Sequence, residues 1–215
     1  MASIVFDLDG TLIDSAPDIR NIANRVLSQT GYAPLSMKET HAFIGNGAGV
    51  FVQKMCKARS VPASEQALNL KTFLDLYEGA VDLTKPYPGV IDALIRLRAK
   101  GHRLGICTNK PMAPCRAILT HLNLTDQFDT IIGGDSLTVR KPNPEPLQEA
   151  IDQLKGGFAI YVGDSEVDSE TARRANVPFV LFSRGYRKTS IDQLHHDATF
   201  DDFENLPDII EMVIV

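Results

Sequence analysis

Short apolar segments alternate with amphipathic segments of helical period through much of this 215-residue chain. Strands that alternate with helices of roughly 10–15 residues predict parallel β-α-β units. The predicted strands span 4–6, 103–107, 128–132, 158–162 and 178–182. Each is a continuous apolar run, which is typical of a sheet covered by helices on both faces. The pattern therefore predicts an α/β fold with a doubly wound parallel sheet.

The spacing of the first two strands indicates an insertion. Asp7 and Thr108 each follow a predicted strand, yet they lie 101 positions apart. A β-α-β unit needs only about 30 residues. The surplus has helical patterns and no convincing strand. We therefore expect an α/β core formed by residues 1–14 and 86–215, with an inserted helical cap at 15–85.

Composition narrows the possible partners and surroundings. The formal net charge is −5, which argues against general binding to nucleic acid or to an anionic membrane. The apolar runs are too short to span a bilayer, and the N-terminus does not resemble a signal peptide. The three cysteines form no CxxC motif, so we expect reduced thiols in a cytoplasmic protein. The sequence does not decide between a monomer and a homodimer.

Polar groups follow four of the predicted strands. They are Asp7 and Asp9, Thr108 and Asn109, Gly133 to Asp135, and Asp164. In an open parallel sheet, ligands bind beyond the carboxyl ends of the strands. We therefore expect these residues to converge at one edge of the sheet, although they are far apart in the sequence.

The acidic residues at this edge predict a metal site. Asp7 and Asp9 are two positions apart in an extended segment, so they share a side. Asp164 and Asp168 lie one helical turn apart, again on one side. Two like charges at about 4 Å repel by roughly 4 kcal/mol at an effective dielectric near 20, and a divalent cation would relieve that repulsion. Oxygen ligands without His or Cys favour Mg²⁺.

Four motifs of the chain resemble those of the haloacid dehalogenase superfamily and occur in the same order. They are DLDGTLIDS at 7–15, TN at 108–109, KP at 141–142 and GDSEVD at 163–168. The helical insertion matches the cap that follows the first motif in this family. The resemblance covers essentially the whole chain. It implies a doubly wound core with strand order 3-2-1-4-5.

The resemblance also implies roles for individual residues. Asp7 would be the nucleophile, Asp9 the general acid and base, and Thr108 and Lys141 the phosphoryl ligands. Asp7, the backbone carbonyl of Asp9, and Asp164 would bind Mg²⁺. We expect Asp168 to position Asp164, metal-bound water or Lys141. Family members that cleave carbon–halogen bonds lack the second aspartate, so Asp9 favours phosphoryl chemistry.

A glycine-rich segment in the cap and the TNKP motif at 108–111 resemble the phosphoglycolate phosphatase branch of the superfamily. The candidate substrate-binding residues are Gly45, Asn46 and Gly47 in the cap, together with Asn109 and Lys110. Lys110 would supply a cation for a substrate carboxylate. A plain turn between helices remains an alternative for the glycine-rich segment. Solvated surface lysines remain alternatives for Lys110 and Lys141.

These observations predict a Mg²⁺-dependent phosphomonoester hydrolase that forms an aspartyl-phosphate. The favoured substrate is a small anionic phosphate ester, 2-phosphoglycolate. One alternative is another phosphatase or a phosphomutase of the same superfamily, acting on a sugar phosphate or pyrophosphate. The other is a receiver-type domain that is phosphorylated on an aspartate without catalysis. A receiver needs neither an acid/base residue nor a lid, so Asp9 and the cap argue against it.

Overall fold

The computed structural model describes residues 1–214. A parallel sheet forms the centre of its larger lobe. Within those residues its strands are β1 (Ala2–Phe6), β4 (Arg103–Cys107), β5 (Thr130–Ile132), β6 (Phe158–Gly163), β7 (Phe179–Phe182) and β8 (Ala198–Phe200). They lie in the order β5-β4-β1-β6-β7-β8, and each neighbouring pair is parallel. Numbered along the chain, this order is 3-2-1-4-5-6. The predicted order is confirmed, and β8 extends it at one edge.

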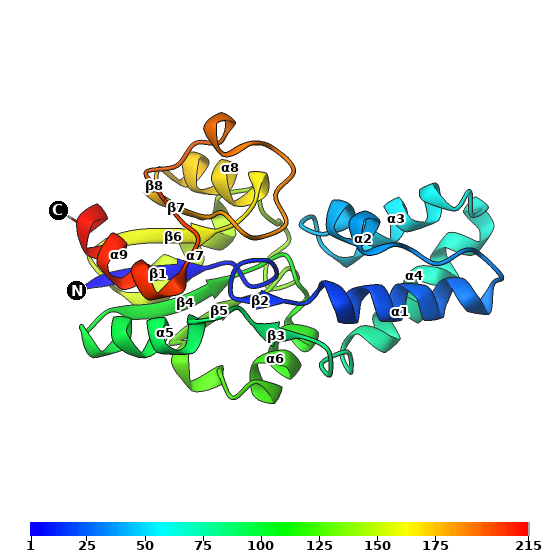
Figure 1. Ribbon diagram of the computed structural model, residues 1–215, viewed down its shortest axis with the longest axis horizontal. Coiled ribbons are helices and arrows are strands. Elements are labelled where there is room, and N and C mark those ends of the chain that lie inside the picture. The colour runs from blue at the N-terminus through cyan, green and yellow to red at the C-terminus, as the bar shows by residue number, and fades with distance from the viewer. Residues whose placement is uncertain (215) are drawn as a thin grey trace.

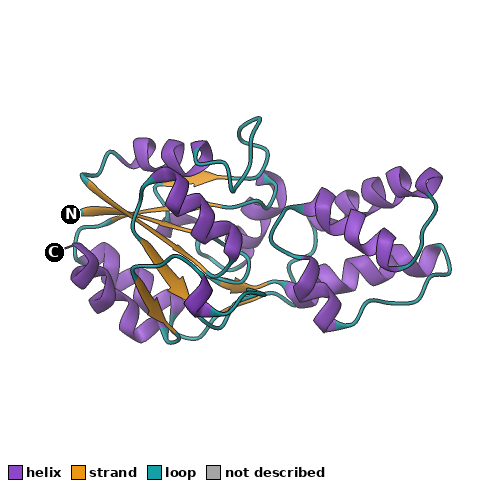
Figure 2. Ribbon diagram, turned by 90° about the horizontal axis from the view of Figure 1, so that it is seen from above, coloured by secondary structure: helices purple, strands orange, loops and turns teal. Residues whose placement is uncertain are grey.

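Helices cover both faces of this sheet (Figure 2). One face carries α5 (Val90–Ala99), α6 (Met112–His121) and α9 (Leu206–Ile214), and the other carries α7 (Glu145–Leu154) and α8 (Glu166–Ala175). Consecutive strand residues alternate between the two faces. Ile4 and Phe6 pack in the cluster with α5, α6 and α9, whereas Val5 packs in the cluster with α7 and α8. Each apolar strand therefore contributes side chains to two separate cores, one on each face of the sheet, as predicted.

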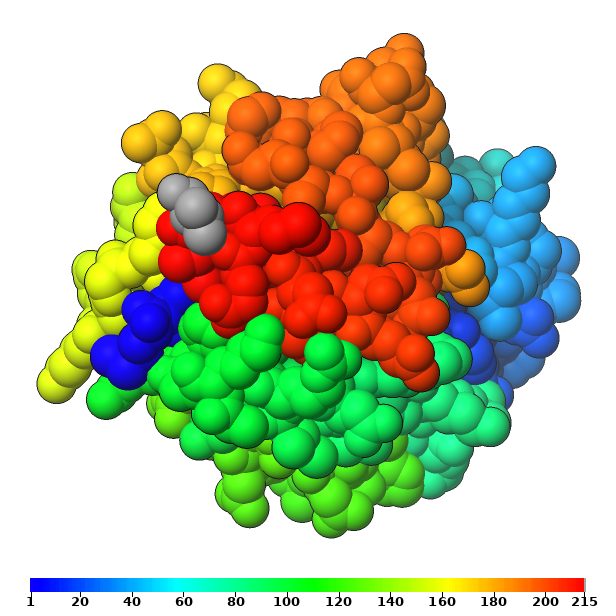
Figure 3. Space-filling model, turned by 60° about the vertical axis from the view of Figure 1, so that its left-hand side comes forward, coloured from blue at the N-terminus to red at the C-terminus, as the bar shows by residue number. Residues whose placement is uncertain are grey.

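The C-terminal helix completes the first of these two faces. Helix α9 packs beside α5, and the two helices are adjacent on the surface in Figure 3. Short 3-10 segments η1 (Thr125–Gln127), η2 (Ile191–Gln193) and η3 (Phe203–Asn205) lie in connecting loops. No helix within residues 1–214 combines the length and the apolar character needed to cross a membrane.

A second lobe consists of helices and lies beyond one end of the sheet (Figure 1). It contains α1 (Ala16–Gln29), α2 (Met37–Phe43), α3 (Ala48–Ala58) and α4 (Ala63–Tyr77). These helices share an apolar cluster distinct from those of the sheet. The apolar positions of α1 recur at helical spacing and are all buried: Ile19, Ile22, Ala23, Val26 and Leu27. The periodicity therefore predicted both the helix and its buried face.

The chain passes between the two lobes at a short antiparallel pair, β2 (Ile13–Asp14) and β3 (Lys85–Pro86). Buried Asp18 joins the same two passages. Its Oδ2 accepts hydrogen bonds from the backbone N–H of Leu83 at 3.0 Å and from that of Thr84 at 2.7 Å. The sequence placed the two links between the lobes near 14–18 and 83–88, but strands of two residues leave no periodic signal, so their pairing was not predicted. This junction holds the helical lobe beyond the carboxyl ends of the strands.

Candidate active site

The carboxyl ends of β1 and β6 bring three aspartates together. Within the described residues, Asp7, Asp164 and Asp168 form a buried cluster whose carboxylate oxygens lie within 4.8 Å of one another. Leu8 is fully buried in the core, as expected for the residue between two acids that share a side. The convergence predicted from strand ends is therefore present for these three acids.

Asp9 lies at the same edge, but its carboxylate has other partners. Its Oδ1 accepts a hydrogen bond from the Ser15 hydroxyl at 2.5 Å and contacts the Lys110 ammonium at 3.2 Å. Ser15 precedes α1, yet its side chain makes no capping bond to that helix. Its hydroxyl instead orients Asp9 toward the cavity that Asp7 also lines.

Lys141 links two carboxylates of the cluster. Its Nζ lies 2.8 Å from Asp7 Oδ1 and 2.7 Å from Asp168 Oδ1. It also donates to the Tyr161 hydroxyl at 2.8 Å. The Lys141 side chain is only 2% exposed, so the alternative of a solvated loop lysine is wrong. Of the expected roles for Asp168, contact with Lys141 is the one that the side chains make.

Burial makes ionisation of two of these aspartates costly. Desolvation raises the pKa of Asp7 to about 7, against the lowering effect of Lys141. Desolvation, together with the charges of Asp168 and Asp7, raises the pKa of Asp164 well above its usual value. For Asp168, burial acts in the same direction, but Lys141 and hydrogen bonds hold its pKa below the usual value. Asp7 and Asp164 thus form an oxygen-only pair that a divalent cation would stabilise.

The loop after β7 encloses Asp164. Its carboxylate accepts hydrogen bonds from the Thr11 hydroxyl at 2.8 Å and from the backbone N–H of Tyr186 at 2.6 Å. A Cβ atom on Gly185 would lie 2.3 Å from the Asp164 carboxylate, so the loop can pass this closely only with glycine. Gly185 and Tyr186 are not among the site residues predicted from the sequence. The available signal was the RGY segment shortly after the fifth predicted strand, at the same sheet edge.

The residues after β4 connect the sheet with the cap. Thr108 is buried and lines the cavity. The Asn109 side-chain amide donates to the backbone oxygen of Gly45 at 3.1 Å and to that of Lys141 at 3.0 Å. From the sequence, Asn109 was expected only as a substrate-binding residue. The structure adds a side chain that joins the cap loop to the loop of Lys141.

The glycine-rich cap loop lies against the site. Gly45 and Gly47 line the cavity, and Gly47 begins α3 with a φ of 84°. A Cβ atom on Gly47 would lie 3.2 Å from the backbone oxygen of Asn109. Asn46 does not line this cavity, and its side-chain oxygen is buried without a hydrogen-bond partner among residues 1–214. The loop is therefore placed as expected, whereas the Asn46 side chain is not on the cavity wall.

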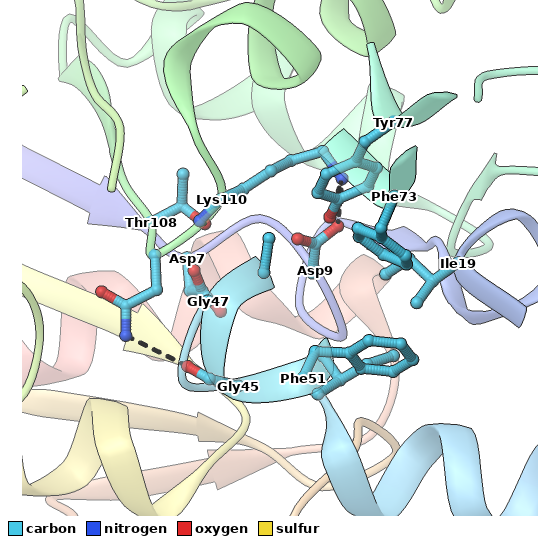
Figure 4. Close-up of a pocket in the computed structure, with 13 residues that line it drawn as sticks. Asp7, Asp9, Ile19, Gly45, Gly47, Phe51, Phe73, Tyr77, Thr108 and Lys110 are labelled. Atoms are coloured by element: carbon cyan, nitrogen blue, oxygen red, sulfur yellow. Dashed lines mark hydrogen bonds and ion pairs between the residues drawn. The ribbon is translucent and has the colours of Figure 1, made fainter. Parts of the chain in front are cut away.

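Figure 4 shows the cavity between sheet edge and cap. Its lining residues are Asp7, Asp9, Thr108, Asn109 and Lys110 from the core and Ile19, Ile44, Gly45, Gly47, Ala48, Phe51, Phe73 and Tyr77 from the cap. Lys110 is 4% exposed, so the solvated alternative is wrong for this lysine as well. Burial would lower its pKa, but Asp9 and Tyr77 outweigh that effect and raise it. A second opening is lined by Asp164, Glu166 and Lys188, among others.

The chain matches the family model of haloacid dehalogenase-like hydrolases over residues 4–182. It therefore belongs to this family, and the resemblance stated from the motifs is confirmed. Among curated proteins, it is 47% identical to a phosphoglycolate phosphatase of Rhodobacter capsulatus, over 97% of this chain and 96% of that protein. It is 44% identical to a phosphoglycolate phosphatase of Cereibacter sphaeroides over the full length of both.

A solved structure has the same overall arrangement. It is described as a predicted phosphoglycolate phosphatase from Haemophilus somnus and is 32% identical in sequence. The superposition has a TM-score of 0.88 and covers 98% of this chain and 96% of that one. The similarity therefore includes both the α/β core and the helical lobe.

Proposed function

We propose that the chain is a phosphomonoester hydrolase that acts on 2-phosphoglycolate and releases glycolate and phosphate. The observation that carries the proposal is the position of Asp7. Its carboxylate contacts Lys141 at 2.8 Å and lines the same cavity as Asp9. The names of the relatives at 44–47% identity support the choice of substrate.

The first half of the reaction is attack by Asp7. A carboxylate oxygen of Asp7 bonds to phosphorus while the bond between phosphorus and the ester oxygen breaks, which forms an aspartyl-phosphate. Asp9 in its acid form donates a proton to the departing oxygen, so that glycolate leaves. Lys141 and the Thr108 hydroxyl would hold the negative oxygens of the transferring group.

The second half reverses the role of Asp9. As a carboxylate, Asp9 takes a proton from water while the water oxygen bonds to phosphorus. The bond between phosphorus and the Asp7 oxygen breaks, which releases phosphate and restores Asp7. The hydrogen bond from Ser15 to Asp9 orients this carboxylate. Asp9 therefore serves both steps from one position.

The buried carboxylates fit a Mg²⁺ ion. Asp7, Asp164 and the backbone carbonyl of Asp9 would hold it, whereas Asp168 is engaged with Lys141. When bound, Mg²⁺ supplies positive charge that neutralises the carboxylates and the phosphoryl oxygens. The raised pKa values of Asp7 and Asp164 favour this assignment, because a cation would offset the cost of their burial.

We further propose that residues 15–85 act as a cap over a core formed by residues 1–14 and 86–215. The β2–β3 pair lies at both boundaries, and the cap helices have their own apolar cluster. The cap would exclude water from the transferring group and contact the rest of the substrate. Gly45 and Gly47 would allow close approach, because glycine has no side chain.

The alternatives fit the cavity less well. Its cap wall is largely apolar and includes Ile19, Phe51 and Phe73. The hydroxyls of a sugar phosphate would lose their hydrogen bonds to water against this wall. A receiver-type domain would have no use for Asp9 or for the helical lobe. Neither alternative accounts for both the acid beside the nucleophile and the apolar wall.

The experiment is a substrate panel with measurement of released phosphate. The panel contains 2-phosphoglycolate, hexose phosphates, pyrophosphate and an aryl phosphate, each with Mg²⁺ and with EDTA. We expect the highest kcat/KM for 2-phosphoglycolate, loss of activity in EDTA, recovery with Mg²⁺ and poor recovery with Ca²⁺. A higher kcat/KM for a hexose phosphate or pyrophosphate would restore the alternative. Full turnover in excess chelator would exclude the metal.

A further inference from the structure

Lys110 has an unusual position for a lysine that follows a strand. Its ammonium is buried and donates a 2.8 Å hydrogen bond to the Tyr77 hydroxyl on cap helix α4. It lies 4.3 Å from the centre of the Tyr77 ring, within the range of a cation–π contact. Its other contact is Asp9, at 3.2 Å. A core cation is thus held by the cap and by the proposed acid/base residue (Figure 4).

The charged side chains that line the cavity differ in sign. Among its lining residues in the described part of the chain, Lys110 is the one cationic side chain. An ammonium has three N–H donors, and two protein acceptors lie within hydrogen-bond distance of it in residues 1–214. One donor therefore remains for an incoming acceptor. Tyr77 would hold the ammonium in place while that acceptor binds.

The position of Asp9 indicates which part of a substrate would reach Lys110. Asp9 must lie beside the ester oxygen that it protonates, and Lys110 is in direct contact with Asp9. In 2-phosphoglycolate the carboxylate is attached to the carbon that carries this oxygen. Its negative charge would therefore lie within reach of the ammonium. The phosphoryl end would be held separately, at Lys141 and Thr108.

We propose that Lys110 and Tyr77 together form a subsite for the substrate carboxylate, which selects phosphorylated acids over neutral phosphate esters. This inference rests on the proposed function, because it assumes a phosphomonoester hydrolase with Asp9 beside the leaving group. It assigns Lys110 as a substrate-binding residue. Tyr77 is a positioning residue contributed by the cap, so the subsite is complete only when cap and core are together.

The test compares two esters of similar size. One is 2-phosphoglycolate, and the other is 2-hydroxyethyl phosphate, in which a neutral CH₂OH group replaces the carboxylate. The quantity measured is the ratio of their kcat/KM values, with 2-phosphoglycolate in the numerator. Effects of a variant on phosphoryl chemistry alter both esters and cancel in this ratio. The variants are Lys110→Met, Lys110→Arg and Tyr77→Phe, with Lys71→Met as the control, because Lys71 is an exposed lysine of the same cap helix that lines neither opening.

We expect a ratio well above one for the wild type. Lys110→Met should lower it by ~10–100-fold, as for loss of a hydrogen bond to a charged group. Lys110→Arg should recover part of the loss, because it restores the charge. Tyr77→Phe keeps the ring but loses the hydroxyl, so it should lower the ratio by about 3–10-fold. Lys71→Met should leave the ratio unchanged.

Three results would overturn the inference, and the third is distinguishable from the first two. A high wild-type ratio that persists in Lys110→Met would reject the subsite while the proposed function stands, and so would an equal fall in Lys71→Met. A wild-type ratio below one would reject both the carboxylate subsite and 2-phosphoglycolate as the favoured substrate. Tyr77→Phe keeps the inference testable if Lys110→Met does not fold.

Discussion

At the residue scale, the site combines buried Asp7, the proposed nucleophile, with a cation that neutralises it only in part. Lys141 contacts both Asp7 and Asp168, so its single positive charge is shared by two carboxylates. Within residues 1–214, Asp164 has no such partner, and hydrogen bonds from Thr11 and Tyr186 hold it. The cost of ionising both Asp7 and Asp164 in this buried site is the physical reason for expecting a metal between them.

Gly185 offers a test of this local geometry. A Cβ atom there would lie 2.3 Å from the Asp164 carboxylate, so Gly185→Ala should displace Asp164 or the loop. We expect ~10–100-fold weaker Mg²⁺ binding, as for other changes that disturb the groups supporting a metal ligand. Isothermal titration calorimetry measures this directly. Gly157→Ala is the control, because a Cβ at Gly157 meets nothing within 4 Å. Equal affinities for both variants would contradict the assignment of Asp164.

The strand-end pattern predicted Asp7 and Asp164, and the family resemblance implied Lys141, but neither could predict their tyrosine partners. Tyr161 lies inside the apolar run of β6, where nothing in the sequence distinguishes it from the other strand residues. Its hydroxyl reaches Lys141 and Asp168 only because α8 and the loop of Lys141 pack against that strand. Tyr77 lies near the end of α4, and its contact with Lys110 depends on how the cap meets the core. Such contacts arise from tertiary packing, which a local pattern does not encode.

At the element scale, hydrogen bonds and an ion pair hold helices α2 and α3 of the cap together. Ser36 and Glu39 form a reciprocal capping box at its N-terminus. Glu39 also pairs with Arg59, the residue that ends α3, at 2.8 Å. Arg59 donates further bonds to the backbone oxygens of Ala33 and Pro34. One glutamate thus connects the start of α2 with the end of α3.

Glu39 gives a pH-dependent prediction for cap stability. Hydrogen bonds from Arg59 and Ser36 lower the pKa of Glu39 to about 2. Because the folded-state pKa is depressed, this stabilisation is present above the ordinary value of 4.5 and is lost as pH falls toward 2. Solvent screens the pair, since Glu39 is 35% exposed. Glu39→Gln should therefore lower the free energy of unfolding by about 1 kcal/mol at pH 7.

Urea unfolding at pH 7 and near pH 3 measures this effect. The difference between wild type and Glu39→Gln should shrink at the lower pH. Glu78→Gln serves as the control, because Glu78 is exposed and has no ion pair within residues 1–214. A loss of stability in Glu39→Gln that is independent of pH would show that the carboxylate charge is not what stabilises α2.

The long elements were more predictable than the short ones. Helical spacing identified α1, and apolar runs identified β1, β4 and β6 within a residue or two. The edge strand β8 escaped prediction because it is three residues long and lies in a polar segment. The β2 and β3 segments have two residues each, which is too short for any period to be visible. These short pieces depend on pairing partners that are distant in the sequence.

At the scale of the whole molecule, the site belongs to neither lobe alone. The sheet edge supplies the acids and Lys141, whereas the cap supplies the glycine-rich loop and the aromatic wall. Hydrogen bonds join the two lobes at the cavity, among them those from Asn109 to Gly45 and from Lys110 to Tyr77. The arithmetic of strand spacing predicted an inserted helical segment. It could not predict which cap residues would meet the core.

The most direct test of the proposed function is whether a phosphate group becomes attached to Asp7. The protein is mixed with Mg²⁺ and 2-phosphoglycolate labelled in the phosphoryl group, quenched in acid within milliseconds, and digested for mass spectrometry. We expect label on the peptide containing Asp7 in the wild type and in Asp9→Asn, where hydrolysis of the intermediate should slow. Asp7→Asn should carry no label. Label retained by Asp7→Asn, or turnover without label on Asp7 in Asp9→Asn, would contradict nucleophilic catalysis by Asp7.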